Sequence, residues 1–167
     1  MLVTVAYAEE AADSSFGDAL ARHGAVLLAA ARLITLDEAE AQDVVQATYE
    51  IALRRRHTLR DLDSLRAWLL AIETREAIRR VGLMRRFLSL NPLIHDTASI
   101  DPCPDDALVL KAGMRALPRR VRAAIALHYL EGYSVRETAA VLHVSENTIK
   151  TQIKKGLARL REELGDE

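Results

Sequence analysis

The chain has 167 residues, of which 50% are hydrophobic and 4% aromatic, and its formal net charge is −1. This hydrophobic fraction excludes disorder of the whole chain, and a composition rich in Ala, Leu, Arg and Glu favours helices over strands. Because Cys103 is the lone cysteine, no intramolecular disulfide can form, and we expect a cytoplasmic protein without a signal peptide or membrane-spanning segment.

The first half of the chain predicts three helices. Residues 1–12 carry no helix cap and no apolar periodicity, so we expect them to be flexible. Apolar spacing predicts a first helix over residues 15–34. Thr35 and Glu38 have the spacing of a capping box that begins a second helix, which reaches about Arg56. A third helix is expected from Ser64 to about Val81, with Trp68 on its apolar stripe.

Charge changes sharply within these helices. Residues 1–53 hold two basic and nine acidic side chains, whereas residues 54–86 hold ten basic and four acidic ones. A local basic segment matters more for binding phosphate groups than the net charge does. The acidic front and basic middle therefore allow a nucleic-acid partner, although solvated helix faces would also explain them.

Prolines divide the chain after the third helix. Pro92, Pro102 and Pro104 cannot lie inside a helix, so residues 87–104 are predicted to be a linker. Asp105 then opens a fourth helix, and Pro118 lies in the first turn of a fifth, which ends near Gly132. The predicted fold is all-α, with a helical domain over residues 13–86, the linker, and a second helical domain over residues 105–167.

A helix-turn-helix is predicted after Gly132. Ser134 and Glu137 make a second capping box, which begins a short helix, and Ser145 can cap a longer one. Two closely spaced helices of this kind are typical of the motif that reads duplex DNA. We expect small Ala139 and Ala140 to let the two helices pack closely.

The last helix separates into two faces. Ile149, Ile153, Leu157, Leu160 and Leu164 recur at helical spacing and form the apolar one. The candidate DNA-reading side chains lie away from this stripe or on the preceding helix, and they are Arg136, Glu146, Asn147, Thr148, Lys150, Thr151, Lys154 and Lys155. Lysine can bond guanine or phosphate, and asparagine can pair with adenine. An amphipathic surface helix with ordinary lysines is the alternative interpretation.

No pattern indicates catalysis or a bound cofactor. The five histidines are scattered, without the spacing of a zinc site, and the chain has no glycine-rich phosphate loop. We therefore expect no enzymatic activity, no metal site and no cofactor.

Four segments resemble the extracytoplasmic-function (ECF) group of bacterial RNA polymerase sigma factors. Residues 43–49, Asp-Val-Val-Gln-Ala-Thr-Tyr, are similar to that family's Asp-Leu-Val-Gln-Glu-Thr-Phe, and residues 65–69 are similar to its Phe-Arg-Ala-Trp-Leu. Residues 117–122 resemble its Leu-Pro-x-x-x-Arg, and residues 133–150 its helix-turn-helix pattern. The resemblance covers residues 16–164 in the family's order.

The resemblance implies partners and residue roles. Asp43, Gln46 and Tyr49 would bind the β′ clamp helices of core RNA polymerase, and the helix-turn-helix would read the promoter −35 element. The −10 element would meet the basic residues Arg54, Arg55, Arg56, His57, Arg66, Arg75, Arg79 and Arg80. An anti-sigma factor is a further expected partner, and no membrane insertion is expected.

Two departures from the family pattern stand out. The family's Ala-Arg-Asn on the third helix is replaced by Glu73-Thr74-Arg75, and its later Asp by Arg79. Asn147 stands where many members have Gly. The −10 and −35 preferences are therefore left open.

Two alternatives remain at this stage. A stand-alone helix-turn-helix regulator would normally need a dimerisation element, which does not follow the motif here. A sigma mimic that titrates an anti-sigma factor would have no use for the lysines of the reading face.

Overall fold

The computed structural model describes residues 15–90 and 105–164, and both parts consist of helices without a strand among the described residues. The N-terminal bundle, residues 15–90, contains a short helix over 15–21, α2 (Gly24–Thr35), α3 (Glu38–Arg55), the 3-10 turn η1 (Arg56–Thr58) and α4 (Leu65–Leu90). The C-terminal bundle, residues 105–164, contains α5 (Asp105–Arg115), α6 (Arg119–Ile125), the π-helical η2 (Ala126–Leu130), α7 (Val135–Leu142) and α8 (Glu146–Leu164). The all-α prediction is confirmed.

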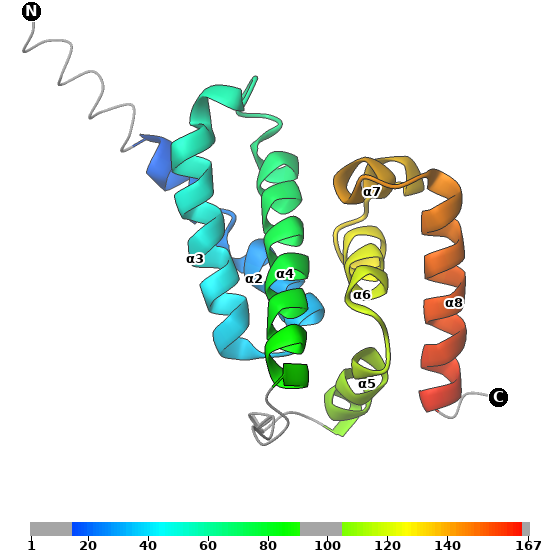
Figure 1. The fold of residues 1–167 in the computed structure, drawn as a ribbon. Coiled ribbons are helices and arrows are strands. Elements are labelled where there is room, and N and C mark those ends of the chain that lie inside the picture. The colour runs from blue at the N-terminus through cyan, green and yellow to red at the C-terminus, as the bar shows by residue number, and fades with distance from the viewer. Residues whose placement is uncertain (1–14, 91–104, 165–167) are drawn as a thin grey trace, which may run out of the picture.

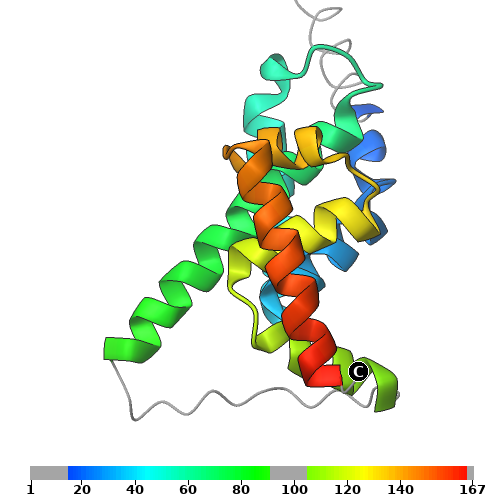
Figure 2. The same cartoon turned by 90° about the vertical axis from the view of Figure 1, so that its right-hand side faces the viewer.

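Helix α4 lies in the middle of the molecule. In Figure 1, α3 lies on one side of α4, α6 and α7 lie on the other, and α2 passes behind it; α4 contacts all four helices. Helices α3 and α8 lie on opposite outer sides (Figure 1), and the last turns of α4 project away from the other helices (Figure 2). A hydrophobic cluster that joins the two bundles contains Ala31, Val44 and Ala77 of the first and Leu127 and Ile149 of the second.

The predicted first helix is interrupted. Residues 22 and 23 form a turn between the helix over 15–21 and α2, so the expectation of one helix over 15–34 was wrong. At Gly24, which follows the turn, a side chain would collide with the Tyr49 hydroxyl of α3, 2.9 Å from an ideal Cβ position. The break brings α2 close to α3 at this point.

The cap of α3 also differs from the prediction. Asp37, not Thr35, is the N-cap, and its carboxylate accepts a 2.8 Å hydrogen bond from the Glu40 backbone N–H. Thr35 instead donates to the Ala31 carbonyl, and Glu38 pairs with Arg32. The carboxylate at position 37 therefore takes over the capping that the sequence assigned to a hydroxyl.

Helix α4 is longer than predicted. It ends at Leu90 instead of Val81, so the first four residues of the predicted linker are helical. The sequence has Pro92 two residues after this end, which agrees with the tendency of helices to stop before a proline. The rest of that linker, with Cys103, and the predicted flexible residues 1–12 lie outside the described residues. Trp68 is partly buried and packs on the core cluster of Leu65 and Leu69, as its place on the apolar stripe predicted.

The helix-turn-helix has the predicted caps and turn. Ser134 and Glu137 form the capping box of α7, and Gly132, with φ at +74°, ends the preceding helix. His143 turns the chain in a left-handed conformation between α7 and α8. Ala139 is buried, as expected, but Ala140 is exposed, so only the former provides close packing.

Candidate nucleic-acid interface

The reading face of α8 is built from the turn that precedes it. The hydroxyl of Ser145 accepts a hydrogen bond from the Thr148 backbone N–H at 3.2 Å, which fixes the start of the helix. Ile149 and Ile153 are buried on the inner face of α8, so the opposite face of this helix is exposed to solvent. The candidate residues that this arrangement leaves exposed are Glu146, Asn147, Lys150, Thr151, Lys154 and Lys155. Arg136 on α7 is exposed as well, whereas Thr148 is half-buried.

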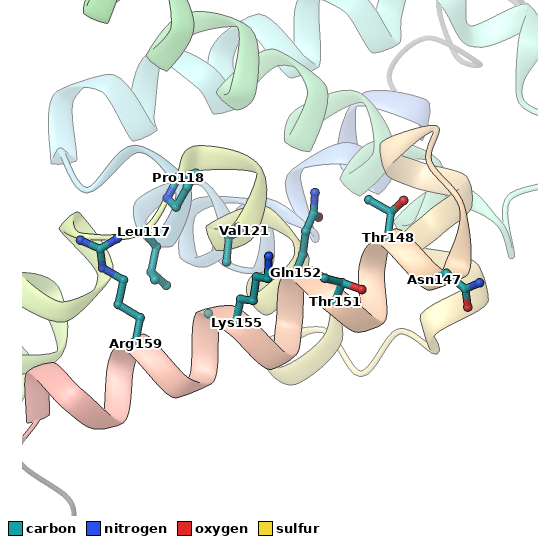
Figure 3. A pocket seen from close by; sticks show the side chains of 10 residues that line it. Leu117, Pro118, Val121, Asn147, Thr148, Thr151, Gln152, Lys155 and Arg159 are labelled. Atoms are coloured by element: carbon teal, nitrogen blue, oxygen red, sulfur yellow. The ribbon is translucent and has the colours of Figure 1, made fainter.

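A groove of about 560 Å³ runs between α6 and this end of α8. Leu117, Pro118 and Val121 line one side, and Figure 3 shows Asn147, Thr151 and Lys155 along the other. Gly156 permits the close approach of the two helices, because a Cβ there would lie 2.6 Å from a Val121 methyl group. The groove gives the reading face an apolar floor and a polar rim.

Two polar residues of the groove were missed by the sequence prediction. Arg159 lines it one turn after Lys155, and Gln152 lies deeper, with a buried Oε1 that has no hydrogen-bond partner in the described part of the chain. A signal for Arg159 is available in the sequence, because Thr151, Lys155 and Arg159 recur every four residues and must share a face of the helix. Nothing in the sequence pattern distinguishes Gln152.

The candidate −10 residues fall into three groups. Arg54, Arg55, Arg56 and His57 are exposed where α3 ends and η1 follows. Burial lowers the pKa of Arg75 on α4, and the nearby charge of Arg55 lowers it further. The structure therefore brings the end of α3 and the middle of α4 together into one basic region.

The second group is Arg79 and Arg80, which share one acidic partner. Glu76 is largely buried and accepts hydrogen bonds from Arg79 at 2.5 and 2.8 Å and from Arg80 at 3.1 Å. These bonds, that of Arg79 first, hold the pKa of Glu76 below its ordinary value. Arg80 also reaches Asp43 on α3 at 3.2 Å. A candidate polymerase-binding residue and a candidate DNA-binding residue are thus in direct contact.

The third group, Arg66 and Arg75, contacts the C-terminal bundle. Arg66 forms a 2.5 Å ion pair with Glu131, which follows η2, and Arg75 donates a 3.1 Å hydrogen bond to the Val141 carbonyl of α7. Both arginines keep part of their surface exposed. In this arrangement they hold the two bundles together.

The candidate polymerase-binding residues divide by exposure. Asp43 and Gln46 are exposed on α3. Tyr49 is half-buried and packs on the core cluster of Leu20 and Leu27, and burial raises the pKa of its hydroxyl. Asp43 and Gln46 can meet a partner surface directly, whereas Tyr49 contributes mainly to packing in this arrangement.

None of the helices in the described ranges is long and apolar enough to cross a membrane. Within the same ranges, no group of three or more His, Cys, Asp or Glu side chains is placed to hold a metal ion.

Two family models match the chain, one in each bundle. The model described as Sigma-70 region 2 matches residues 19–86, and the one described as Sigma-70, region 4 matches residues 108–160. The first match contains the basic segment and the second contains the helix-turn-helix.

Characterised relatives match across both bundles. The ECF RNA polymerase sigma factor SigX of Bacillus subtilis is 30% identical over 141 residues, which cover 77% of this chain and 72% of SigX. The RNA polymerase sigma-E factor of Streptomyces coelicolor is 32% identical over 144 residues, which cover 83% of this chain and 79% of the relative.

Solved structures share the fold. The sigma factor RpoE from Bartonella quintana, in complex with the anti-sigma factor NepR, matches with a TM-score of 0.78 at 24% identity and covers 92% of this chain and 98% of its own. CnrH, in complex with the cytosolic domain of CnrY, matches with a TM-score of 0.67 at 29% identity and covers 93% of this chain and 91% of its own.

Proposed function

The chain belongs to the ECF group of bacterial RNA polymerase sigma factors, and we propose that its exposed α8 face, its basic α3–α4 region and its acidic α3 face divide the work of promoter recognition. As a sigma factor it directs transcription initiation, with core RNA polymerase and promoter DNA as partners. The proposal concerns which side chains make each contact.

The −35 element is assigned to α8. The supporting observation is the row of exposed polar and basic side chains on a helix whose start is fixed by Ser145 and whose other face is buried. Lys150, Thr151, Lys154 and Lys155 can meet base edges or phosphates in the major groove, with Arg159 at the far end of the row. Glu146, Asn147, Thr148 and Arg136 complete the proposed interface.

The −10 element is assigned to the basic region of α3 and α4. Opening a promoter requires flipped or single-stranded bases to be held by cationic side chains. Arg54, Arg55, Arg56 and His57 are exposed at the end of α3 and in η1, and Arg79 and Arg80 lie further along α4. Arg66 and Arg75 become available when their contacts to the C-terminal bundle are released.

Core polymerase is assigned to the exposed face of α3, which carries Asp43 and Gln46. Helices α3 and α8 lie on opposite sides of the molecule (Figure 1), so one chain can contact polymerase and promoter DNA at separate surfaces. An acidic face suits a basic partner surface.

By analogy with RpoE bound to NepR, we also propose that an anti-sigma factor binds this chain. We further expect a cytoplasmic protein without catalytic turnover.

Transcription by reconstituted holoenzyme tests the assignment of α8. We expect Lys150→Ala and Lys154→Ala each to reduce transcription from a −35-dependent promoter about 5- to 150-fold if the lysine reads a base, since such a contact contributes about 1–3 kcal/mol, and less if it binds phosphate. Core binding, measured in parallel by fluorescence anisotropy, should stay unchanged.

Lys111→Ala is the matched control, because it removes a lysine from α5, outside the proposed interface. Normal transcription by both α8 variants would show that the reading face is misassigned. Unchanged core binding by Asp43→Ala, which removes a carboxylate from the exposed face of α3, would instead contradict the assignment of that face.

A further inference from the structure

An acidic pair lies between the two bundles and is not used by the proposed function. Glu73 on α4 is fully buried, and Glu131, which follows η2, is 9% exposed. Ala77, one turn after Glu73 on the same side of α4, belongs to the hydrophobic cluster that joins the bundles. Glu73 therefore lies where α4 is covered by neighbouring helices, the C-terminal bundle among them.

Only part of this acidic pair is neutralised. Glu131 has Arg66 as its ionic partner, at 2.5 Å. Glu73 accepts one hydrogen bond, at 3.2 Å from the hydroxyl of Thr74, and its Oε1 has no hydrogen-bond partner among the described residues. The hydroxyl of Tyr133, which packs on the same cluster, is also buried without a partner there. A buried charged carboxylate with so few partners is costly.

Glu73 can lower this cost by binding a proton. Burial, reinforced by the negative charge of Glu131, raises the pKa of Glu73 from 4.5 to about 8. If the bundles separate, water reaches the carboxyl group and its pKa falls toward the ordinary value. The closed arrangement then holds a proton that the open arrangement releases near neutral pH.

We propose that closure of the two bundles over the Glu73–Glu131 pair is coupled to uptake of a proton, so that acidification favours the closed chain and alkaline pH favours the open one. Closing also engages Arg66 and Arg75 with Glu131 and the Val141 carbonyl. Any effect of closure on promoter binding rests on the proposed −10 function of Arg66 and Arg75. Closure itself does not depend on that function.

The sign follows from proton linkage. Below about pH 4.5 the carboxyl group is protonated in both arrangements and closure is independent of pH. Between about 4.5 and 8 the open chain releases the proton while the closed chain keeps it, so the ratio of closed to open chains falls up to about tenfold per pH unit. Above about pH 8 the dependence ends.

Other titratable groups lie around the pair. Burial raises the pKa of Glu131, which Arg66 on α4 pairs with. The charge of Arg66 also acts on His23 at the start of α2 and on Tyr133 before α7. Burial and the charge of Arg66 lower the pKa of His23 below its ordinary value of 6.5, so His23 is neutral above pH 7. A change in closure between pH 7 and 8 is therefore assigned to Glu73 and not to His23.

Energy transfer between two dyes on the full chain measures closure without DNA or polymerase. Glu50→Cys on α3 and Ala158→Cys on α8 are exposed labelling positions, in a Cys103→Ser background. We expect transfer efficiency to fall as pH rises from 5.5 to 8.5, including the interval from 7 to 8. Efficiency that does not change with pH would overturn the proposal, whatever the outcome of the transcription assays.

Variants identify the responsible group. Glu73→Gln keeps the shape of the side chain without its charge and should stay closed across the range, whereas His23→Gln should retain the response between pH 7 and 8. An unchanged response in Glu73→Gln would overturn the role of Glu73. Glu73→Met, an apolar helix former of similar length, serves if circular dichroism shows that Glu73→Gln does not fold.

Discussion

Ser134 illustrates how far a single residue's role follows from local sequence. Its hydroxyl accepts a hydrogen bond from the Glu137 backbone N–H at 3.2 Å, and the Glu137 carboxylate returns to the Ser134 backbone N–H at 2.8 Å. Both bonds lie within four consecutive residues, so the spacing alone predicted them. The same spacing at Thr35 and Glu38 gave a wrong cap, because Asp37 lies between them and its carboxylate reaches the backbone first.

Replacing Ser134 tests the contribution of this cap. We expect Ser134→Ala to lower the free energy of unfolding by about 1 kcal/mol, since the first turn of α7 loses a side-chain partner for a backbone N–H. Urea denaturation followed by circular dichroism measures the change. Ser134→Asp, which can still cap the helix, is the control and should lose much less. Equal losses in the two variants would mean that the hydroxyl does not act as a cap.

Whole helices were predicted well where their signals are local. Pro118 and Gly132 mark the start and end of the α6–η2 segment, and Asp105 marks the start of α5. The turn at residues 22 and 23 was missed, because the contact between Gly24 and the Tyr49 hydroxyl joins residues that are far apart in sequence. The π-helical geometry of η2 also carries no local signal.

The packing of α8 on α6 depends on Gly156. We expect Gly156→Ala to lower the free energy of unfolding by about 1–3 kcal/mol, because the new Cβ would lie 2.6 Å from a Val121 methyl group and 3.0 Å from one of Ile125. Thermal denaturation measures the loss. Gly17→Ala is the matched control: no atom lies within 4 Å of its added Cβ, so this helical change should be neutral or stabilising. A stable Gly156→Ala variant would mean that the helices adjust without cost.

At the scale of the whole molecule, the sequence predicted the two helical bundles but not their contact. Charge counts and motifs identified Arg66 and Arg75 as basic residues without indicating that Glu131 and the Val141 carbonyl would bind them. Likewise, Glu73 was noted as a departure from the family pattern, but its burial depends on tertiary packing. The candidate DNA-reading face of α8, by contrast, follows from helical periodicity within one element and could be predicted from sequence.

Replacement of Arg122 tests the contact between the two bundles. It belongs to the Leu-Pro-x-x-x-Arg motif, and its buried guanidinium donates hydrogen bonds to the Ile34 carbonyl of the N-terminal bundle at 2.8 Å and to the Leu117 carbonyl at 3.0 Å. Hydrogen bonds from a charged donor contribute about 1.5–3 kcal/mol each. The bond to Ile34 couples the stability of one bundle to the position of the other.

We expect Arg122→Ala to lower the free energy of unfolding by at least about 2 kcal/mol and to separate one cooperative transition into two, because the bundles lose a bond that joins them. Urea denaturation followed both by Trp68 fluorescence, which reports on the N-terminal bundle, and by circular dichroism, which reports on all helices, measures both effects. Arg120→Ala, an exposed neighbour on α6, should change stability by less than about 0.5 kcal/mol. Coincident transitions in Arg122→Ala would mean that the remaining contacts, the hydrophobic cluster and the bonds of Arg66 and Arg75, hold the bundles together without Arg122.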